Sequence, residues 1–131
     1  MYQYENIILT VKDNFPEIEE KKMELLGTDL SEQIASEDSP YVFFPVFWKL
    51  FEYALIGKIK DNGIINRITT FMENMANSDA ETRNLMSIEM LEPLFGLKYE
   101  VYEKVVSQHL LPESLKIHKE QLRYFRAPTP S

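Results

Sequence analysis

The side chains that could carry out acid–base or metal chemistry are few in this chain, and their spacing assembles no site. Only two histidines occur, His109 and His118, nine positions apart on either side of Pro112. Two histidines that bind one metal from one helix stand three or four positions apart, so this spacing excludes that motif. We expect both imidazoles at the surface or at the boundary of the core, without a catalytic role.

Paired carboxylates offer a second kind of chemistry, because two acids on one helix face can converge on a cation or a water molecule. Glu89 and Glu92 have this spacing, and Glu100 and Glu103 repeat it. A di-metal carboxylate site also requires Glu-x-x-His units from two helices, and the sequence contains none. We therefore expect solvated helix faces here. An enzyme built from carboxylates stays open as an alternative, and an added cation would raise its melting temperature.

Nucleophilic and phosphate-binding chemistry lacks its usual motifs as well. The four glycines are scattered, at positions 27, 57, 63 and 96, so no phosphate-binding loop or dinucleotide fingerprint is present. No serine stands in a small-residue elbow. The absence of cysteine excludes disulfides, thiolate zinc sites, iron–sulfur clusters and a cysteine nucleophile. We predict no catalytic residue, no metal site and no cofactor.

The elements that position these side chains are predicted to be helices. Beyond residue 40 apolar residues recur almost everywhere at the spacing of one helix face, and strand alternation appears over no useful length. Helices are predicted over residues 4–14, 16–26, 45–56, 61–77, 78–95, 98–110 and 112–125. The sequence thus predicts an all-α fold, a single compact globule of about seven helices packed as antiparallel helical hairpins. Residues 1–126 form this single domain, and residues 127–131 form a disordered tail.

The predicted helix 45–56 is apolar almost all round, which is typical of a central helix wrapped by others. Pro40 and Pro45 push the residues before them toward extended backbone, so we interpret residues 41–44 as an irregular apolar segment. Five aromatic residues of this region are expected in the core: Phe43, Phe44, Phe47, Trp48 and Phe51. Six tyrosines are candidates for exposed positions at an interface: Tyr2, Tyr4, Tyr41, Tyr99, Tyr102 and Tyr124.

The boundaries of the predicted helix 78–95 follow from capping signals. Ser78 and Glu81 have the spacing of a capping box, in which each side chain accepts a hydrogen bond from the backbone amide of the other residue. Gly96 is predicted to end the helix in the left-handed conformation. Pro93 lies in the last turn and has no N–H to donate, so a kink or an early end of the helix is predicted near Glu92.

The net charge is −7, and the whole imbalance lies in the first third of the chain. Residues 1–40 contain ten acids and three lysines, whereas residues 41–131 contain eleven acids and eleven bases. Within the acidic third, residues 27–39 are rich in Ser, Asp and Glu and are predicted to form a mobile loop. We expect no nucleic-acid partner, because such a partner requires a concentrated basic patch. An acidic surface instead favours rapid encounter with a basic protein.

Membrane insertion and export are not predicted either. The longest stretch without a charged side chain is ten residues, Ser39–Trp48, and it contains two prolines. A spanning helix requires about 20 apolar residues. The apolar run at residues 7–11 follows Glu5 and is too short for the core of a signal peptide. We expect no membrane partner and a cytoplasmic location.

Three consecutive helical segments follow one another in the middle of the chain. The first is the apolar run Phe43–Ile56. The second is Arg67–Met75, with Phe71-Met72-Glu73 at its centre. The third is Ser78–Leu94, which contains Asp79-Ala80-Glu81-Thr82-Arg83-Asn84-Leu85 and Glu89–Glu92. Together these segments cover about residues 40–95 of the chain. They resemble the small helical immunity proteins that are encoded beside polymorphic and contact-dependent bacterial toxins.

The resemblance implies a bacterial protein without enzymatic activity that neutralises a basic, nucleic-acid-degrading toxin domain. Its carboxylates would replace phosphates in the toxin's substrate groove and so occlude it. Seven acids are the predicted partner-binding positions: Glu17, Glu20, Glu24, Asp29, Glu37, Asp38 and Asp79. The alternative is a helical scaffold or regulatory adaptor that binds its partner through an apolar groove. The identity of the partner, the oligomeric state and the face that forms the interface stay open.

Overall fold

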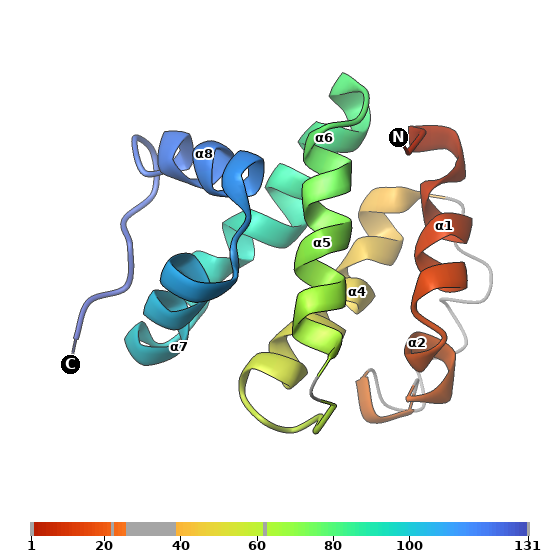
Figure 1. Ribbon diagram of the computed structural model, residues 1–131, viewed down its shortest axis with the longest axis horizontal. Helices are drawn as coiled ribbons and strands as arrows, with labels where there is room; N and C mark the ends of the chain where they lie inside the picture. The colour runs from red at the N-terminus through yellow and green to blue at the C-terminus, as the bar shows by residue number, and fades with distance from the viewer. Residues whose placement is uncertain (1, 22, 26–38, 62, 131) are drawn as a thin grey trace.

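The computed structural model describes residues 2–21, 23–25, 39–61 and 63–130, and all regular structure among them is helical (Figure 1). The α-helices are α1 (Ile7–Asn14), α2 (Glu17–Glu20), α4 (Pro40–Leu55), α5 (Ile64–Ala76), α6 (Ala80–Met86), α7 (Tyr99–Lys104) and α8 (Pro112–Gln121). The short 3-10 helices are η1 (Tyr4–Asn6) and η3 (Glu92–Gly96), and the π-helices are η2 (Ser87–Leu91) and η4 (Val105–His109).

The all-α fold predicted from the sequence is confirmed for the described part of the chain, and each of the seven predicted helical segments has a counterpart. Packing as antiparallel hairpins, the single-domain boundary and the disordered tail stay predictions. The predicted mobile loop lies largely outside the described residues, with only Ser39 inside them, as the residue before α4. No helix in the described ranges is long and apolar enough to cross a membrane.

Helix α4 is the centre of the fold, as its nearly continuous apolar sequence predicts. It packs against α1, α2, α5 and η2. Four phenylalanines of α4 are fully buried, which confirms the predicted aromatic core: Phe43, Phe44, Phe47 and Phe51. Trp48 is half-buried and meets Phe51 edge-on, with ring centroids 5.8 Å apart. Full burial of a large apolar side chain stabilises a fold by about 1.5–3 kcal/mol, so this helix supplies much of the driving force for folding.

The start of α4 corrects the prediction of an irregular segment at residues 41–44, because the helix begins at Pro40 and runs through Pro45. Pro40 occupies the first helical turn, where a missing N–H loses no hydrogen bond. Pro45 does remove the bond that its nitrogen would otherwise give to the carbonyl of Tyr41. Complete burial of Phe43 and Phe44 in the core offsets that loss.

The junction between α5 and α6 also differs from the predicted capping box. The N-cap of α6 is Asp79, whose Oδ1 accepts a hydrogen bond from the Thr82 amide at 2.8 Å. Ser78 lies one residue too early, and its hydroxyl donates to the carbonyl of Asn74 at 2.7 Å. A serine hydroxyl often bonds the carbonyl four residues back when it still belongs to the preceding helix. The cap is therefore shifted by one residue.

The predicted helix 78–95 is three helices of different winding joined end to end. α6 passes into the π-helix η2, and η2 passes into the 3-10 helix η3 with Pro93 in its first turn. The predicted early end of the helix near Glu92 is confirmed, because η2 ends at Leu91 and the winding changes to a 3-10 helix at Glu92. Gly96 is not left-handed: the described glycine with positive φ is Gly57, at 80°, in the link after α4. The extended backbone of Leu97, with φ −78° and ψ 157°, ends η3 instead.

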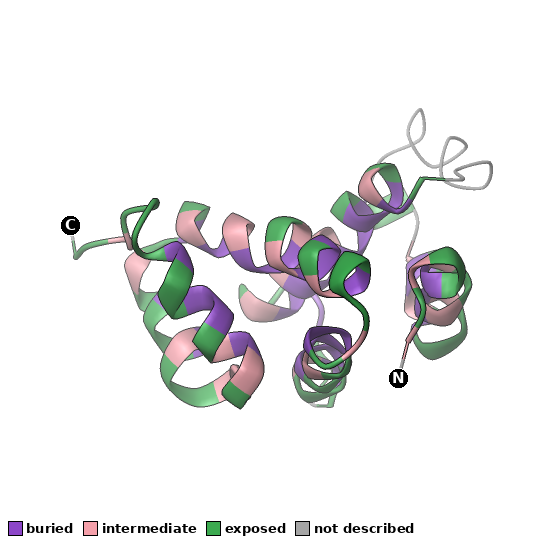
Figure 2. Cartoon of the chain, turned by 90° about the horizontal axis from the view of Figure 1, so that it is seen from above, coloured by how far each residue is buried: buried purple, intermediate pink, exposed green. Residues whose placement is uncertain are grey.

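Helix α8 closes the fold by returning to elements much earlier in the chain. It packs against α5 and η2, and the buried sides of the helices in Figure 2 turn toward one another. Contacts between elements so distant in sequence distinguish this fold from a solenoid, in which each unit touches only its neighbours. Residues 122–130 contain no helix, and Ala127 packs against the core.

Candidate functional site

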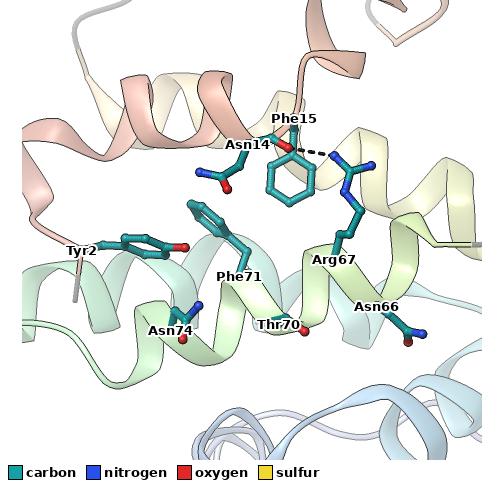
Figure 3. A pocket seen from close by; sticks show the side chains of 8 residues that line it. All are labelled: Tyr2, Asn14, Phe15, Asn66, Arg67, Thr70, Phe71 and Asn74. Atoms are coloured by element: carbon teal, nitrogen blue, oxygen red, sulfur yellow. Dashed lines mark hydrogen bonds between the residues drawn. The ribbon is translucent and has the colours of Figure 1, made fainter.

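A groove of about 350 Å³ lies between the end of α1 and one face of α5 (Figure 3). We call it the α1–α5 groove, and its lining residues are Tyr2, Asn14, Phe15, Asn66, Arg67, Thr70, Phe71 and Asn74. Phe15 and Phe71 form an aromatic floor, with ring centroids 5.4 Å apart in an edge-to-face arrangement. Tyr2 stacks on Phe71 at 4.6 Å and closes one end.

The local sequence explains why the floor is aromatic. Pro16 disfavours helical backbone at the residue before it, so α1 ends and Phe15 takes φ −131° and ψ 71°. This turn brings the Phe15 ring to 4.8 Å from the ring of Phe47 in α4. Phe71 follows Ile68 at helical spacing on the buried face of α5. Both floor rings are therefore held by the core beneath them.

The α5 rim of the groove is a row of uncharged polar side chains. Asn66, Thr70 and Asn74 stand four residues apart and are exposed, so they line one side of the helix (Figure 3). None of the three side chains makes a hydrogen bond to another residue in the described ranges. The remaining described asparagine side chains all donate one, as follows: Asn6 to Gln3, Asn14 to Thr10, Asn77 to Glu73 and Asn84 to Tyr41.

Arg67 fastens the other end of the groove and neutralises one of the predicted partner-binding acids. Its Nη2 donates to the Asn14 carbonyl at 2.8 Å and to Oε1 of Glu17 at 3.2 Å, while Nη1 donates to Oε2 of Glu17. The guanidinium lies over the Phe15 ring, 5.2 Å from its centroid. The hydrogen bond from Arg67 lowers the pKa of the Glu17 carboxyl. Glu17 thus joins α2 to α5, and its charge is compensated.

Asp79 holds the N-terminal segment in place. Its Oδ2 accepts a hydrogen bond from the Tyr4 amide at 3.4 Å, and the neighbouring Ser78 hydroxyl accepts one from the Tyr2 amide at 2.9 Å. Hydrogen bonding from the Thr82 amide lowers the pKa of the Asp79 carboxyl. Asp79 stays exposed and ionised, but its position has a structural explanation as a helix cap.

The predicted partner-binding acids do not form one cluster. Glu20 and Glu24 are exposed near Glu17 in sequence, whereas Asp79 lies beyond the opposite end of α5. From residue 67 to residue 79 a helical rise amounts to about 18 Å. Three further predicted positions lie outside the described residues: Asp29, Glu37 and Asp38. The structure therefore describes four of the predicted acids, of which Glu17, Glu20 and Glu24 are neighbours along the chain and Asp79 is separate.

His118 corrects the prediction of a surface or boundary imidazole, because the residue is completely buried. Its ring stacks on Phe95, with centroids 4.8 Å apart. Burial lowers the pKa of the His118 imidazole. Tyr102 is likewise only 5 % exposed, so it is not the exposed interface tyrosine predicted from the sequence. Tyr124 at 84 % is exposed as predicted.

A chain of hydrogen bonds fixes the tautomer of the neutral His118 imidazole. Gln121 donates from Nε2 to the Ser87 carbonyl and hydroxyl, at 2.9 Å each, so its Oε1 is left to accept. The Nδ1 of His118 lies 3.2 Å from that Oε1 and must carry a proton. Nε2 then accepts from the Tyr102 hydroxyl at 2.7 Å. The network joins α7, α8 and η2 around a neutral imidazole that solvent does not reach.

The predicted carboxylate pairs differ from each other in the structure. Glu100 and Glu103 are exposed, as expected of a solvated face. Glu89 and Glu92 are half-buried instead, and burial together with the neighbouring Glu92 charge raises the pKa of Glu89. Among the residues that the structure describes, no group of three or more His, Asp or Glu side chains is placed to hold a metal ion.

A second hollow, of about 290 Å³, lies beside α7. Four aliphatic side chains form its walls, namely Leu55, Ile65, Val101 and Val105, and Glu100, Lys104 and His109 complete its lining. His109 is half-buried, and its burial, with Lys104 nearby, lowers the pKa of its imidazole. This hollow is the more apolar of the two surfaces.

The sequence singled out Tyr2 as an interface candidate, but it did not predict the polar row on α5. The available signal was the repetition of asparagine and threonine within a predicted amphipathic helix, at positions 66, 70 and 74. These residue types have lower helix propensity than the Glu, Lys or Ala that an exposed helix position usually carries. The opposite wall depends on how α1 docks, which local sequence does not specify.

Comparison with known proteins places the chain in one domain family. The family model described as a domain of unknown function, DUF7674, matches residues 8–126. This match runs from α1 to the segment after α8. No curated protein and no solved structure matches the chain.

Proposed function

Because the chain belongs to the DUF7674 family, a domain without an assigned function, we propose its function from its own surface: it is an immunity protein that binds and neutralises a basic bacterial toxin domain. It acts in the cytoplasm, without enzymatic activity and without a nucleic-acid or membrane partner. Carboxylates of its N-terminal region occupy the toxin's cationic substrate groove, where the substrate's phosphates would otherwise lie, and so exclude the substrate.

The observation that supports this proposal is the excess of acids over bases among the described residues before α4. Residues 2–21 and 23–25 contain six acids and two lysines. Glu20 and Glu24 are exposed, and neither makes an ion pair with another described residue. Carboxylates in this state speed the encounter with a cationic surface and favour the correct partner.

The two capping or bridging acids have a smaller role in this proposal. Glu17 is held by Arg67, so it keeps the acidic surface in place rather than meeting the toxin as a separate charge. Asp79 caps α6 and lies at the far end of α5. Glu20 and Glu24 therefore contribute most of the described charge at the interface, together with the predicted positions Asp29, Glu37 and Asp38.

The test uses the toxin domain encoded directly beside this gene, since an immunity gene normally adjoins the gene of its toxin. We expect co-expression of this protein to rescue cells that express that domain. Stopped-flow mixing of the two purified proteins is expected to give an association rate that falls steeply as ionic strength rises. Glu20→Lys with Glu24→Lys is expected to slow association by about tenfold at low salt.

A matched control changes the same net charge elsewhere on the surface. Glu100→Lys with Glu103→Lys reverses two exposed acids on α7, far along the chain from the acidic surface. This variant is expected to associate at nearly the wild-type rate. Equal slowing by both variants, or an association rate independent of salt, would count against the proposed interface.

The alternative function, a helical adaptor, has one observation in its favour. The hollow beside α7 has four aliphatic walls and the shape of a site for an apolar side chain. An adaptor that used it would bind its partner with little dependence on salt. Val101→Glu would weaken that binding, while Glu20→Lys would leave it unchanged, so the two functions give opposite results with the same pair of variants.

A further inference from the structure

Surfaces of opposite charge lie at the two ends of the long axis of this chain. Figure 1 shows α1 and α2 at one end, and α8 with the segment after it at the other. The described residues before α4 contain six acids and two lysines, whereas residues 112–126 contain four bases and two acids. We propose that copies of this chain associate head to tail, the α1 end of one copy against the α8 end of the next. This self-association does not depend on the proposed toxin partner.

A cationic hollow marks the α8 end. It measures about 350 Å³, and its lining residues are Pro112, Leu115, Lys116, Lys119, Glu120 and Arg123. All four charged residues are exposed. None of the three cations makes an ion pair with another described residue. The hollow therefore presents three positive charges and one negative charge to a partner.

The turn after α8 adds an apolar patch next to Arg123. Its side chains are 44 % exposed at Leu122, 84 % at Tyr124 and 41 % at Phe125. The Gln121 carbonyl fixes the turn, because it accepts hydrogen bonds from the amides of Tyr124 and Phe125 at 2.9 Å each. The Phe125 ring also stacks on Phe95, with centroids 5.1 Å apart. Neighbouring apolar side chains held at the surface beside charged ones are typical of an interaction site, whereas single exposed ones are common everywhere. We call the hollow and this patch the α8 surface.

At the other end, α1 presents the opposite charges around one apolar side chain. Glu5 of η1 and Leu9 and Asp13 of α1 stand four residues apart, so they share one side of the helix. All three are exposed, Leu9 by 64 %. Neither acid makes an ion pair with another described residue. The buried side of α1, with Ile7 and Val11, packs against α4 instead. We call the exposed residues the α1 row.

The α1 row and the α8 surface complement each other in charge and in polarity. Each has apolar side chains beside charged ones, and the charges have opposite sign. Such complementarity steers the encounter of two surfaces and fixes their orientation, whereas two surfaces of like charge repel each other. A symmetric dimer would place like surfaces together, so the head-to-tail arrangement is favoured. In that arrangement a pair of copies keeps one unoccupied surface of each kind, and further copies add to it.

Sedimentation velocity on the full chain, without any other protein, measures the association. We expect the average mass to rise at least about twofold between about 10 μM and about 1 mM protein at about 50 mM salt. At about 500 mM salt it is expected to return to the mass of one chain, because salt screens the charges. In NMR spectra of the chain labelled with nitrogen-15, dilution is expected to shift the amide signals of Leu9 and Tyr124 together.

Charge reversal tests which surfaces meet. Lys119→Glu with Arg123→Glu makes both surfaces acidic, and Glu5→Lys with Asp13→Lys makes both basic. Each variant alone is expected to stay a single chain up to about 1 mM. An equal mixture of the two is expected to associate again, because every contact then joins an acidic surface to a basic one. Recovery in the mixture also shows that both variants are folded.

Two further variants separate the surfaces from general effects. Glu100→Lys with Glu103→Lys changes the net charge as much as the α1-row variant but lies outside both surfaces, on α7. It is expected to associate like the wild type. Tyr124→Ser is expected to weaken association at least about fivefold without lowering the melting temperature, since Tyr124 is exposed.

The outcomes that overturn the proposal are equally definite. They are a wild type that stays a single chain at every concentration, association that is unchanged by salt, or a mixture of the reversed variants that does not recover. Shifts at Tyr124 caused by an oligonucleotide or by phosphatidylserine vesicles, in a chain that does not self-associate, would assign the α8 surface to that anion instead. Lys119→Glu with Arg123→Glu keeps Glu20 and Glu24, so it is expected to bind the toxin domain normally, and the two proposals can fail separately.

Discussion

The carboxylate of Glu73, in the last turn of α5, caps the first turn of α8 through Glu113 and Ser114. Its Oε1 accepts from the Ser114 amide at 2.9 Å and from the Ser114 hydroxyl at 3.0 Å, and its Oε2 accepts from the Glu113 amide at 2.9 Å. The N-cap of α8 is Leu111, which has no side-chain oxygen to accept these hydrogen bonds. Glu73, which lies 40 positions before Glu113, supplies the acceptor oxygens instead.

Glu73→Ala is expected to lower the free energy of unfolding by about 2 kcal/mol. It removes a charged acceptor from two helix-terminal amides and loses its favourable interaction with the helix dipole. Urea denaturation at neutral pH measures the change. Glu120→Ala, an exposed position on α8 itself, is expected to stay within about 0.5 kcal/mol of the wild type. Equal effects of the two variants would contradict a capping role for Glu73.

The Arg67–Glu17 ion pair is expected to contribute about 0.5 kcal/mol, because solvent screens a pair whose arginine side chain is 42 % exposed. A double-mutant cycle with Arg67→Ala and Glu17→Ala measures this coupling. Since Arg67 lowers the pKa of Glu17, the coupling is present above the ordinary pKa of 4.5 and is lost as the pH falls through the lower folded value. A coupling that persists in strong acid would show that packing, rather than charge, links the two residues.

Tyr102→Phe is expected to lower the free energy of unfolding by about 1.5 kcal/mol. The variant keeps the ring but leaves Nε2 of the buried His118 without a donor. Thermal and urea denaturation both report the change. Tyr124→Phe is the control, because Tyr124 is 84 % exposed and is expected to change stability by less than about 0.5 kcal/mol.

Stability is expected to fall as the pH drops below 6.5. Burial holds the folded pKa of His118 below the ordinary value of 6.5, at which the unfolded chain takes up its proton. Between the two pKa values the unfolded state binds more protons. The stabilisation is therefore complete above pH 6.5 and is lost as the pH falls through the folded pKa. Urea denaturation at steps between about pH 8 and about pH 5 measures the slope.

The variant His109→Gln separates the contribution of His118 to the pH dependence of stability from that of His109. The folded pKa of His109 is also lowered, first by burial and then by Lys104, so His109 acts in the same direction and over the same pH range. His109→Gln is expected to keep the part of the slope that belongs to His118. A flat stability profile in this variant would mean that the buried imidazole does not control the acid side of the stability curve.

Local sequence predicted the elements of the fold well where periodicity and burial agree. The apolar face of α5 and the central position of α4 follow directly from their patterns. Boundaries failed where tertiary packing outweighed a local signal, as at Pro45, where buried phenylalanines on either side keep the helix continuous. The prediction of the N-cap residue of α6 was wrong by one position. Ser78 and Asp79 are both good N-cap residues, and the choice between them depends on where α5 ends.

The candidate site was less predictable because it is made by long-range pairing. The α1–α5 groove exists only after Phe15 reaches Phe71 and Arg67 reaches Glu17, and no helical periodicity encodes those contacts. The buried imidazole was missed for the same reason: His118 lies in a helix with many charged residues, and its partner Tyr102 belongs to another helix. Sequence reasoning places side chains on helix faces, and the docking of helices decides what those faces meet.

In the π-helix η2, one backbone carbonyl accepts two hydrogen bonds. In a π-helical turn the Ser87 carbonyl accepts a hydrogen bond from the amide five residues later, at Glu92. Its second lone pair accepts the hydrogen bond from the side chain of Gln121. Shortening this wide turn by one residue would rotate that oxygen away from α8. Gln121 would then lose its acceptor on η2, and His118 would lose the oriented Oε1 that accepts from its Nδ1. A change of backbone winding in η2 would thus weaken the attachment of α8.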